Sequence, residues 1–266
     1  MEKKTVLITG GSSGIGYEMS RLFGRAGFRL LWVSWSEEEL SEARSRLEQE
    51  ISGVYIRTLC QDLSVLEGAQ YVYDWVKQMG EEVDVLINNA GFGTYGYVWE
   101  TDSAKEVAMI QLNVLNVYRM TRLFLADMVK VDAGVIINIS SNSSFQPVPR
   151  MATYASTKAF VTHFSRGLSE ELKVVRSKVR VITVCPSAIK DTPFKDHADM
   201  ADVKTFSGLA YTTAEEVASD VWRAYSKAGK DFMVTGWKMR FLYAISGWVP
   251  YRLQQFLVRN ETKRSR

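Results

Sequence analysis

The sequence contains few of the side chains from which metal and thiol sites are built. Its 266 residues include only two cysteines and two histidines. Cys60 and Cys185 are far apart and match neither a metal-binding nor a redox spacing. A zinc site needs several such ligands, and His163 and His197 are the only histidines. We therefore expect neither a bound metal nor a histidine-based catalytic triad.

Charge of one sign is also scarce. Lysine and arginine contribute 33 residues, and aspartate and glutamate contribute 30, for a net charge of +3. Binding to a nucleic acid calls for a basic stripe, and the one dense basic stretch is Lys263, Arg264 and Arg266. The composition therefore argues against a nucleic-acid partner.

Long hydrophobic runs are missing as well. The run Val6-Leu7-Ile8 is too short for a signal peptide, so we expect a cytoplasmic protein with reduced thiols. The apolar part of the C-terminal segment, Phe241 to Val249, is too short to span a bilayer, and Lys238, Arg240 and Arg252 flank it closely. This segment is therefore not a transmembrane helix.

The sequence does contain enough apolar material for a sizeable core. With 46% hydrophobic residues, its length suits one large α/β domain or two small ones. In Thr5 to Gly16, TVLITGGSSGIG, an apolar strand runs into a glycine-rich turn and then into a helix that begins near Ser13. A second strand, Arg29 to Val33, completes a βαβ unit.

The glycines of this turn suit the binding of a dinucleotide. Gly10 would permit the turn, Gly14 would let the backbone approach a pyrophosphate, and Gly16 would let helix and strand pack closely. Free N–H groups at the start of the helix would bind the phosphates. The spacing is G-x-x-x-G-x-G and not the common G-x-G-x-x-G, and a glycine-rich turn alone is weak evidence for a cofactor.

The end of the second strand normally contacts the adenosine ribose. An acidic residue there binds the free 2′-hydroxyl, whereas a basic residue accommodates a 2′-phosphate. This sequence has Ser34, Trp35 and Ser36 there. The run Glu37 to Glu39 that follows is interpreted as the solvated first turn of a helix. The lack of a carboxylate at the strand end favours NADP(H) over NAD(H), although no arginine stands there either.

Two further stretches are candidates for ligand contacts. Asp62, after a third strand over Val54 to Leu59, is a candidate to bind the adenine amino group, and the alternative is an N-cap for the next helix. Val83 to Ile87 reads as another buried strand, followed by Asn88-Asn89-Ala90-Gly91. Small residues after a strand suit a backbone that lies against a ligand, and paired asparagines can tie neighbouring strands.

The stretch Ser141 to Lys158 reads SNSSFQPVPRMATYASTK. Tyr154 and Lys158 are four residues apart, so a helix places them on one face. A lysine beside a tyrosine favours the phenolate and lowers the tyrosine pKa from its usual value of about 10. Such a tyrosine exchanges protons near neutral pH. Taken alone, Tyr-x-x-x-Lys is common in helices and identifies no site.

Taken together, these motifs resemble the short-chain dehydrogenase/reductase family over the part of the chain from about Thr5 to about Phe194. The matching elements are TGGSSGIG at 9–16, NNAG at 88–91, Asn113, Ser141 and Tyr154-x-x-x-Lys158. The resemblance implies an α/β fold of the Rossmann type, with a doubly wound parallel sheet of about seven strands between two layers of helices. It also implies a nicotinamide cofactor, hydride transfer and a catalytic tetrad of Asn113, Ser141, Tyr154 and Lys158.

By the family mechanism, Ser141 hydrogen-bonds the substrate carbonyl, and Tyr154 delivers the proton or removes it in the reverse direction. Lys158 would bind the nicotinamide ribose and shift the pKa of Tyr154. We prefer Ser141 to Ser140 because its separation from the tyrosine matches the family. In an extended segment, Ser140 would also face the other way.

Asn113 has a less direct role in the family mechanism. It would kink its helix, expected from about Ser103 to Met128, and hold a water that links Lys158 to solvent. The cofactor contacts that the resemblance implies are Gly10, Ser12, Ser13, Gly14, Ile15, Gly16, Ser34, Trp35, Ser36, Asp62, Leu63, Asn89, Ala90, Gly91, Tyr154, Lys158, Pro186, Ile189 and Thr192.

The segment after the strand Val179 to Cys185 departs from the family pattern. The family has Pro-Gly, then an aliphatic residue, then a threonine that contacts the nicotinamide carboxamide. Pro186 and Ile189 match, but Ser187 replaces the glycine and Thr192 arrives one position late. The carboxamide contact of Thr192 is therefore in doubt, and we expect a negative φ at Ser187.

The residues expected around the substrate are large and apolar. Asp196 to Leu209 is polar and irregular and is interpreted as part of a substrate lid over 187–212. The expected lining is Phe92, Tyr95, Tyr97, Trp99, Phe145, Pro147, Met151, Phe194, Met200 and Phe206. This lining favours a hydrophobic carbonyl compound over a small charged acid, and the alternative is that these residues form ordinary core.

The C-terminal part is expected to extend the fold. Thr213 to Lys227 reads as a helix with a capping pattern, and Phe232 to Thr235 reads as the last strand. We divide the chain into a Rossmann-type domain, 1–236, and a helical extension, 237–266, packed on the domain or on a partner subunit. A helical pair that closes over the pocket or packs on a partner is favoured over a helix at a membrane interface that serves a lipid-like substrate.

The expected function is an NAD(P)(H)-dependent oxidoreductase that interconverts a hydrophobic ketone or aldehyde and its alcohol, with Tyr154 as general acid/base. The resemblance implies a homodimer through the helices that carry Asn113 and Lys158. One alternative is a lyase or epimerase that uses the same tyrosine and lysine. The other is a non-catalytic protein that senses the cofactor, and the presence of both Ser141 and Tyr154 argues against it.

Overall fold

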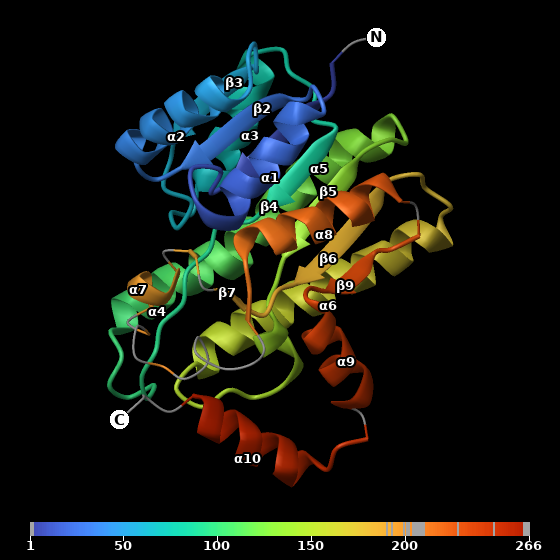
Figure 1. The fold of residues 1–266 in the computed structure, drawn as a ribbon. Coiled ribbons are helices and arrows are strands. Elements are labelled where there is room, and N and C mark those ends of the chain that lie inside the picture. The colour runs from blue at the N-terminus through green and yellow to red at the C-terminus, as the bar shows by residue number, and fades with distance from the viewer. Residues whose placement is uncertain are drawn as a thin grey trace.

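The computed structural model of the chain describes residues 3–189, 191–192, 194–198, 200, 203, 211–227, 229–246 and 248–262. Much of the predicted lid, 187–212, therefore lies outside the described residues, as do Phe206 and the basic stretch from Lys263 to Arg266. The described residues form a parallel sheet between two layers of helices, with a pair of helices beyond one end of it (Figure 1).

The centre of the fold is a seven-stranded sheet in the order β3-β2-β1-β4-β5-β6-β9, in which neighbouring strands are parallel. Its strands are β1 (Thr5–Thr9), β2 (Arg29–Ser34), β3 (Ile56–Cys60), β4 (Val85–Asn88), β5 (Val135–Ile139), β6 (Arg180–Cys185) and β9 (Phe232–Val234). β1 is buried along its whole length, which is typical of a parallel strand with helices on both faces.

Alternate residues of each strand pack against different helices. Val6 and Ile8 belong to a cluster with α1, α2 and α8, whereas Leu7 belongs to a second cluster with α3, α5 and α6. These helices are α1 (Gly14–Arg25), α2 (Glu37–Glu50), α3 (Gly68–Gln78), α5 (Val117–Lys130), α6 (Ala152–Val174) and α8 (Ala214–Ser226). The predicted three-layer Rossmann-type fold is confirmed.

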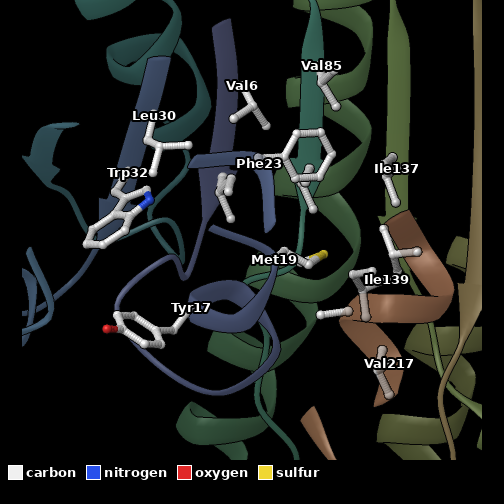
Figure 2. Close-up of a cluster of buried hydrophobic side chains, with 14 of the residues drawn as sticks. Val6, Tyr17, Met19, Phe23, Leu30, Trp32, Val85, Ile137, Ile139 and Val217 are labelled. Carbon is white, nitrogen blue, oxygen red and sulfur yellow. The ribbon is translucent and has the colours of Figure 1, made fainter. Parts of the chain in front are cut away.

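Figure 2 shows how the first cluster fixes α1 on the sheet. Met19 and Phe23 of α1 are fully buried among Val6, Leu30 and other apolar side chains of the strands. Full burial of such a side chain contributes about 1.5–3 kcal/mol. The cluster therefore holds the first turn of α1 firmly beyond the carboxyl end of β1.

The strand order reverses between β1 and β4. From β1 the chain builds β2 and β3 on one side, and it then returns to build β4, β5, β6 and β9 on the other. In such sheets, ligands bind beyond the carboxyl ends of the strands at this reversal. Gly10 follows β1 and Asn89 follows β4, so both motifs lie at this point.

Several local predictions can be compared with the structure. The helix expected over Ser103 to Met128 is divided into α4 (Ser103–Ile110), a π-helical segment (Gln111–Asn116) and α5. The capping box at the start of α8 is present, and Glu37 begins α2 as predicted. The remaining short elements are a 3-10 helix (Asn142–Phe145), α7 (Phe194–His197) and the pair β7 (Ala188–Ile189) and β8 (Tyr211–Thr212).

Two helices follow β9, namely α9 (Trp237–Ser246) and α10 (Tyr251–Glu261). In Figure 1 they lie at the bottom of the molecule, far from α2 and β3 at the top. Within the described residues, no helix combines the length and hydropathy that a bilayer crossing requires. The same residues contain no group of histidine, cysteine or acidic side chains arranged to hold a metal.

Candidate active site

A cavity of about 1230 Å³ lies at the reversal of the strand order. Its walls come from the glycine turn, the ends of β2, β4, β5 and β6, the start of α6, and the two helices α9 and α10. The predicted cofactor residues line it, except for Gly16 and Ser36. Of the predicted tetrad, Ser141, Tyr154 and Lys158 line it.

The glycine turn has the backbone that a phosphate-binding loop needs. Gly10 and Gly14 have φ angles of 66° and 51°, a region in which other side chains are strained. A Cβ atom on Gly16 would lie 2.0 Å from the carbonyl oxygen of Gly10, so helix and turn are in closest contact there. Ser13 does not cap the first N–H groups of α1 with its side chain. The turn therefore fits the pyrophosphate of a dinucleotide.

Paired asparagines fix the loop after β4. Asn88 Nδ2 donates to Asn138 Oδ1 at 2.8 Å, which joins β4 to β5. Asn89 Nδ2 donates to the carbonyl oxygens of Thr9 and Gly10 at 2.9 and 3.2 Å, which joins the loop to the end of β1. The predicted tie between strands is confirmed, and it holds the backbone that follows against the cavity.

Three side chains with proton chemistry meet at the wall of the cavity. Tyr154 and Lys158 are one turn apart on α6, and their exposed fractions are 7% and 5%. Ser141, which follows β5, lies close enough to the Tyr154 side chain to lower the pKa of Tyr154. Lys158 Nζ donates to the Ile139 carbonyl oxygen at 3.1 Å and lies 5.9 Å from the centre of the Tyr154 ring.

The neighbouring serine points elsewhere. Ser140 Oγ donates to the carbonyl oxygen of Lys158 at 2.8 Å and lies 2.7 Å from Thr162 Oγ1. It therefore ties α6 to the end of β5. Of the two serines, Ser141 alone acts on the pKa of Tyr154, in the orientation expected of alternate residues in an extended segment.

Asn113 lies behind this group, fully buried in the π-helical segment. Its Nδ2 donates to the Phe92 carbonyl oxygen at 2.9 Å and to Thr157 Oγ1 at 3.2 Å. Its Oδ1 is buried and has no partner among the described residues. A Cβ on Gly91 would lie 2.8 Å from this oxygen and 3.3 Å from Lys158 Nζ. A water or hydroxyl between them would satisfy the oxygen.

The sequence pattern of one family, described as short chain dehydrogenase, matches residues 4–202. The chain belongs to this family.

Several proteins of named activity are similar to part or nearly all of the chain. The very-long-chain 3-oxoacyl-CoA reductase of Rattus norvegicus is 35% identical over 175 residues, covering 63% of this chain and 54% of the relative. The chain thus spans about half the length of the curated relatives it matches. A short-chain dehydrogenase from Sphingobium yanoikuyae, solved in complex with NADPH, is 27% identical with a TM-score of 0.79 over 99% of this chain and 98% of that one.

The name of a second relative of known structure states its substrate preference. The bulky-bulky ketone specific alcohol dehydrogenase from Comamonas testosteroni is 26% identical, with a TM-score of 0.74. The match covers 93% of this chain and 94% of that one. The comparison therefore extends well beyond the glycine turn and the tyrosine motif.

Protonation of the tyrosine–lysine pair of this family member differs from the prediction. Burial raises the pKa of Tyr154 to about 12, and the hydrogen bond with Ser141 acts in the opposite direction. Burial lowers the pKa of Lys158 to about 8. The prediction that the lysine lowers the pKa of the tyrosine is wrong for this structure. Removal of the phenolate from water is the main cause, and the ammonium of Lys158 is 5.9 Å from the ring centre and bound to a backbone carbonyl.

The corner beside β2 contains a carboxylate that the sequence did not reveal. Ser12 Oγ donates to Ser34 Oγ at 3.1 Å and to Glu39 Oε2 at 3.3 Å, and Glu39 lines the cavity. Ser36 instead caps α2, where its Oγ accepts from the Glu39 N–H at 3.2 Å. The three-residue spacing from this cap carries Glu39 back over the strand end. Among the described residues, this corner includes no lysine or arginine.

Asp62 lines the cavity but does not cap a helix. Its Oδ1 accepts hydrogen bonds from the Ser64 N–H at 2.8 Å and the Ser64 hydroxyl at 2.7 Å. The helix α3 begins only at Gly68, after Glu67. The N-cap alternative is therefore wrong, because the turn at Ser64 separates Asp62 from the helix. The adenine contact stays a prediction.

The loop after β6 follows the family only in part. Pro186, Ile189 and Thr192 line the cavity, and φ at Ser187 lies outside the positive region, as predicted. A Cβ on Gly14 would lie 3.0 Å from Thr192 Cγ2, so Thr192 packs over the glycine turn. Its contact with a carboxamide stays a prediction.

The predicted apolar lining is partly correct. Phe92, Phe145, Met151, Phe194 and Met200 line the cavity. The prediction is wrong for Tyr95, Tyr97, Trp99 and Pro147, which are not in its walls. The rings of Tyr97 and Trp99 stack on each other at the surface, with centres 4.9 Å apart, and both side chains stay exposed.

Part of the lining comes from α9 and α10, in line with the expected helical pair over the pocket, although none of their residues was predicted individually. The added residues are Met239, Leu242, Tyr243 and Ile245 of α9, and Leu257 and Val258 of α10. The spacing of Met239, Leu242 and Tyr243 at i, i+3 and i+4 indicates an inward face and could have identified it. The Tyr243 ring lies 4.6 Å from that of Phe145.

A polar contact fixes the end of α10. The carbonyl oxygen of Thr262 accepts hydrogen bonds from the Tyr95 hydroxyl at 2.6 Å and from Arg150 Nη1 at 3.2 Å. Gln255 Nε2 donates to the Pro147 carbonyl oxygen at 3.5 Å. Residues of the NNAG loop and of the loop before α6 therefore hold α10 over the cavity.

Proposed function

We propose that this chain is an NAD(P)(H)-dependent oxidoreductase that reduces a hydrophobic ketone or aldehyde. The observation that carries the proposal is one cavity shared by the glycine turn, Ser141 with the buried Tyr154 and Lys158, and a wall of apolar side chains. The shared cavity would bring a dinucleotide, a proton donor and an apolar substrate within reach of one another.

A bound nicotinamide dinucleotide would supply the hydride. The N–H groups at the start of α1 would hold its pyrophosphate, and the backbone from Asn89 to Gly91 would lie along it. Asp62 is proposed to bind the adenine. Lys158 would donate to the ribose hydroxyls, and the Ile189 N–H would contact the carboxamide.

Tyr154 would give its proton to the substrate oxygen as negative charge develops there. Because burial raises the pKa of Tyr154 to about 12, the phenol is protonated at neutral pH and suited to the role of acid. Ser141 would donate to the same oxygen. The unpartnered Oδ1 of Asn113 and the ammonium of Lys158 both lie beside Gly91, and a water bound there would return a proton from solvent through the lysine.

The substrate is proposed to be bulky and apolar. Phe92, Phe145 and Met151 line the cavity together with Tyr243 of α9 and Val258 of α10. The relatives include a very-long-chain 3-oxoacyl-CoA reductase and a bulky-bulky ketone specific alcohol dehydrogenase, which supports a large carbonyl substrate. The cavity lining is consistent with either class.

The cofactor preference is proposed to be NAD(H). The expectation of NADP(H) rested on the lack of a carboxylate at the end of β2, but Glu39 supplies one beside Ser12 and Ser34. A carboxylate binds the free 2′-hydroxyl of NAD(H) and repels the 2′-phosphate of NADP(H). The Sphingobium yanoikuyae relative was solved in complex with NADPH. The proposed preference for NAD(H) therefore rests on Glu39 of the present chain and not on that relative.

We also propose a cytoplasmic homodimer that pairs through α5 and α6. Phe160 of α6 is 39% exposed, and its ring stacks on that of Phe164 with centres 5.6 Å apart. A second copy would cover this apolar strip. Size-exclusion chromatography with light scattering is expected to give a dimer, and a tetramer would contradict the proposal.

The function is tested by following NADH and NADPH oxidation over a panel of bulky ketones, β-ketoacyl thioesters and steroids. Tyr154→Phe is expected to lower kcat about 10²–10⁴-fold, the usual contribution of a general acid. Tyr71→Phe, which removes an exposed hydroxyl, is the matched control and should leave turnover unchanged. Unchanged turnover in Tyr154→Phe would refute the mechanism.

A further inference from the structure

The outer side of the two C-terminal helices carries large apolar side chains that no described part of the chain covers. These six residues, the outer face, are Trp237, Phe241, Ile245, Trp248, Leu253 and Phe256. The exposed fractions are 90% for Trp248, 74% for Trp237, 68% for Phe256 and 62% for Phe241. Exposed large apolar side chains gathered on two adjacent segments of a folded chain point to a site of interaction.

Helical spacing sets most of the outer face of α9 apart from the cavity. Trp237 and Phe241 are four residues apart and are not part of the lining, whereas Met239 and Tyr243 line the cavity, and Ile245 is both exposed and part of the lining. On α10, Phe256 is exposed, whereas Gln255 is buried against the domain. Figure 1 shows these helices at one end of the molecule, where a planar surface could approach both. Each helix therefore has one apolar side for the cavity and one for a partner.

The charged residues from 237 to 260 are all positive. Lys238, Arg252 and Arg259 are exposed, and residues 237–260 contain no aspartate or glutamate. In the part of the chain that the structure describes, Arg252 and Arg259 form no ion pair. Arg240 differs, because it pairs with the buried Asp220. The exposed cations are therefore available to an anionic partner.

A second copy of the chain fits this surface poorly. A symmetric dimer sets the same patch of each copy against itself. The cations of one copy would then face the cations of the other, and Glu261 at the end of α10 is the one acidic residue in either helix. Anionic phospholipid headgroups complement the charges, and tryptophan side chains are favoured at the boundary between headgroups and acyl chains.

We propose that the outer face binds the surface of a bilayer containing anionic phospholipid, with α9 and α10 lying in the plane of the headgroups. The three residues Leu242, Ile245 and Leu257 line the cavity and are also exposed, so the cavity opens beside the outer face. An apolar substrate would enter from the bilayer. That last step rests on the proposed function, whereas the binding itself does not.

The binding is tested by flotation of the full chain, without cofactor or substrate, on two kinds of vesicle. The chain is expected to float with mixed phosphatidylcholine–phosphatidylglycerol vesicles and to stay largely unbound with phosphatidylcholine alone. Added salt should weaken the binding. Arg252→Ala should lower the partition coefficient by about fivefold, the contribution of one basic residue near an anionic surface.

Phe256→Asp tests the apolar part, and Val174→Asp is the matched control, because Val174 is 83% exposed at the end of α6. Circular dichroism and thermal melting establish that both variants fold. The proposal predicts loss of flotation in Phe256→Asp and no change in Val174→Asp. Equal flotation of both variants, or wild-type chain that never floats, would overturn it. The proposal would also be overturned if the wild-type chain does not bind vesicles and light scattering shows a dimer that Phe256→Asp dissociates.

Activity is measured separately on a ketone dissolved in the vesicles. Stimulation of the wild type but not of Phe256→Asp by anionic vesicles would support entry from the bilayer. A chain that floats but reduces no ketone would contradict the proposed function and leave the membrane surface standing.

Discussion

The two ends of the cavity are built by different means. The cofactor end rests on the backbone of the glycine turn and on hydrogen bonds from Asn88 and Asn89 to neighbouring strands. The substrate end rests on side chains of loops and of α9, and α9 contains no buried residue. Changes at the first end therefore disturb the sheet, whereas the second end can change with little effect on the core. In this design the reaction is held constant and the substrate is open to variation.

The largest effect on stability and dinucleotide affinity is expected from a change at Gly16 in the cofactor end. A Cβ there would lie 2.0 Å from the backbone oxygen of Gly10, which cannot move without disturbing β1. Gly16→Ala is expected to cost about 3 kcal/mol, near the top of the range for overpacking, and about 100-fold in dinucleotide affinity. Calorimetric titration and chemical denaturation measure the two effects.

Gly167→Ala is the matched control, because a Cβ at this position on α6 would meet nothing within 4 Å. This change should stabilise the chain by about 0.5–1 kcal/mol. A Gly16→Ala variant as stable as Gly167→Ala would show that the turn is not rigid.

At the substrate end, Tyr243→Ala is expected to act on the substrate alone. Its ring contacts those of Phe145 and Phe232, with centres 4.6 and 5.6 Å away. Removal should raise KM for a bulky ketone roughly tenfold and leave dinucleotide affinity unchanged. Tyr251→Ala, an exposed tyrosine outside the lining, is the control. A parallel fall in dinucleotide affinity would mean that the two ends are coupled.

A change at Glu39 tests whether the cofactor end selects between NADH and NADPH. Repulsion between unit charges about 4 Å apart is worth about 1 kcal/mol even in bulk water, so Glu39→Gln should improve NADPH affinity about fivefold. Thermal shift and calorimetric titration with NADH and NADPH measure the preference without turnover. Glu38→Gln makes the same charge change on the exposed side of α2 and should leave it unaltered. If both variants behave alike, the corner does not select the cofactor.

The smallest expected effect is a pH dependence of stability. The pKa of Lys158 is about 8 in the folded chain, below its ordinary value of 10.5, so the unfolded chain binds more protons between these values. The stability that goes with a neutral Lys158 is fully present above pH 10.5 and is lost as pH falls through 8, because the buried side chain must then take up a proton. The free energy of unfolding should therefore rise by about 1 kcal/mol from about pH 7 to about pH 9.

Lys158→Met should remove this rise, and Lys178→Met, at an exposed lysine, should keep it. Denaturant unfolding at several pH values provides the measurement. The window stops near pH 9 because burial raises the pKa values of Cys185 and Tyr154, which act in the opposite sense at higher pH. An identical slope in both variants would contradict the assignment.

Sequence reasoning succeeded where the determinant is local. Strands such as β1 are continuous apolar runs, and the turn after it is fixed by Gly10 and Gly14, so the sheet and the glycine turn follow from short stretches. The capping box of α8 is equally local. The order of the motifs then placed Ser141, Tyr154 and Lys158 in one cavity.

It failed where the determinant is the environment in three dimensions. The raised pKa of Tyr154 depends on burial by Phe194 and other residues distant in sequence, which a four-residue spacing does not report. The lining from α9 depends on how that helix folds back after β9. Glu39 looked solvated because its reach towards Ser12 crosses from one element to another.

The hydrogen bonds that hold α10 have a consequence for protein engineering. Their acceptor is the backbone carbonyl of Thr262, while the donors are the side chains of Tyr95 and Arg150. A library that varies the apolar residues of α9 and α10 to change substrate scope can therefore replace Thr262 and keep this acceptor. Such a library should keep Tyr95 and Arg150 constant, because a changed donor would release the helix that every new lining residue depends on.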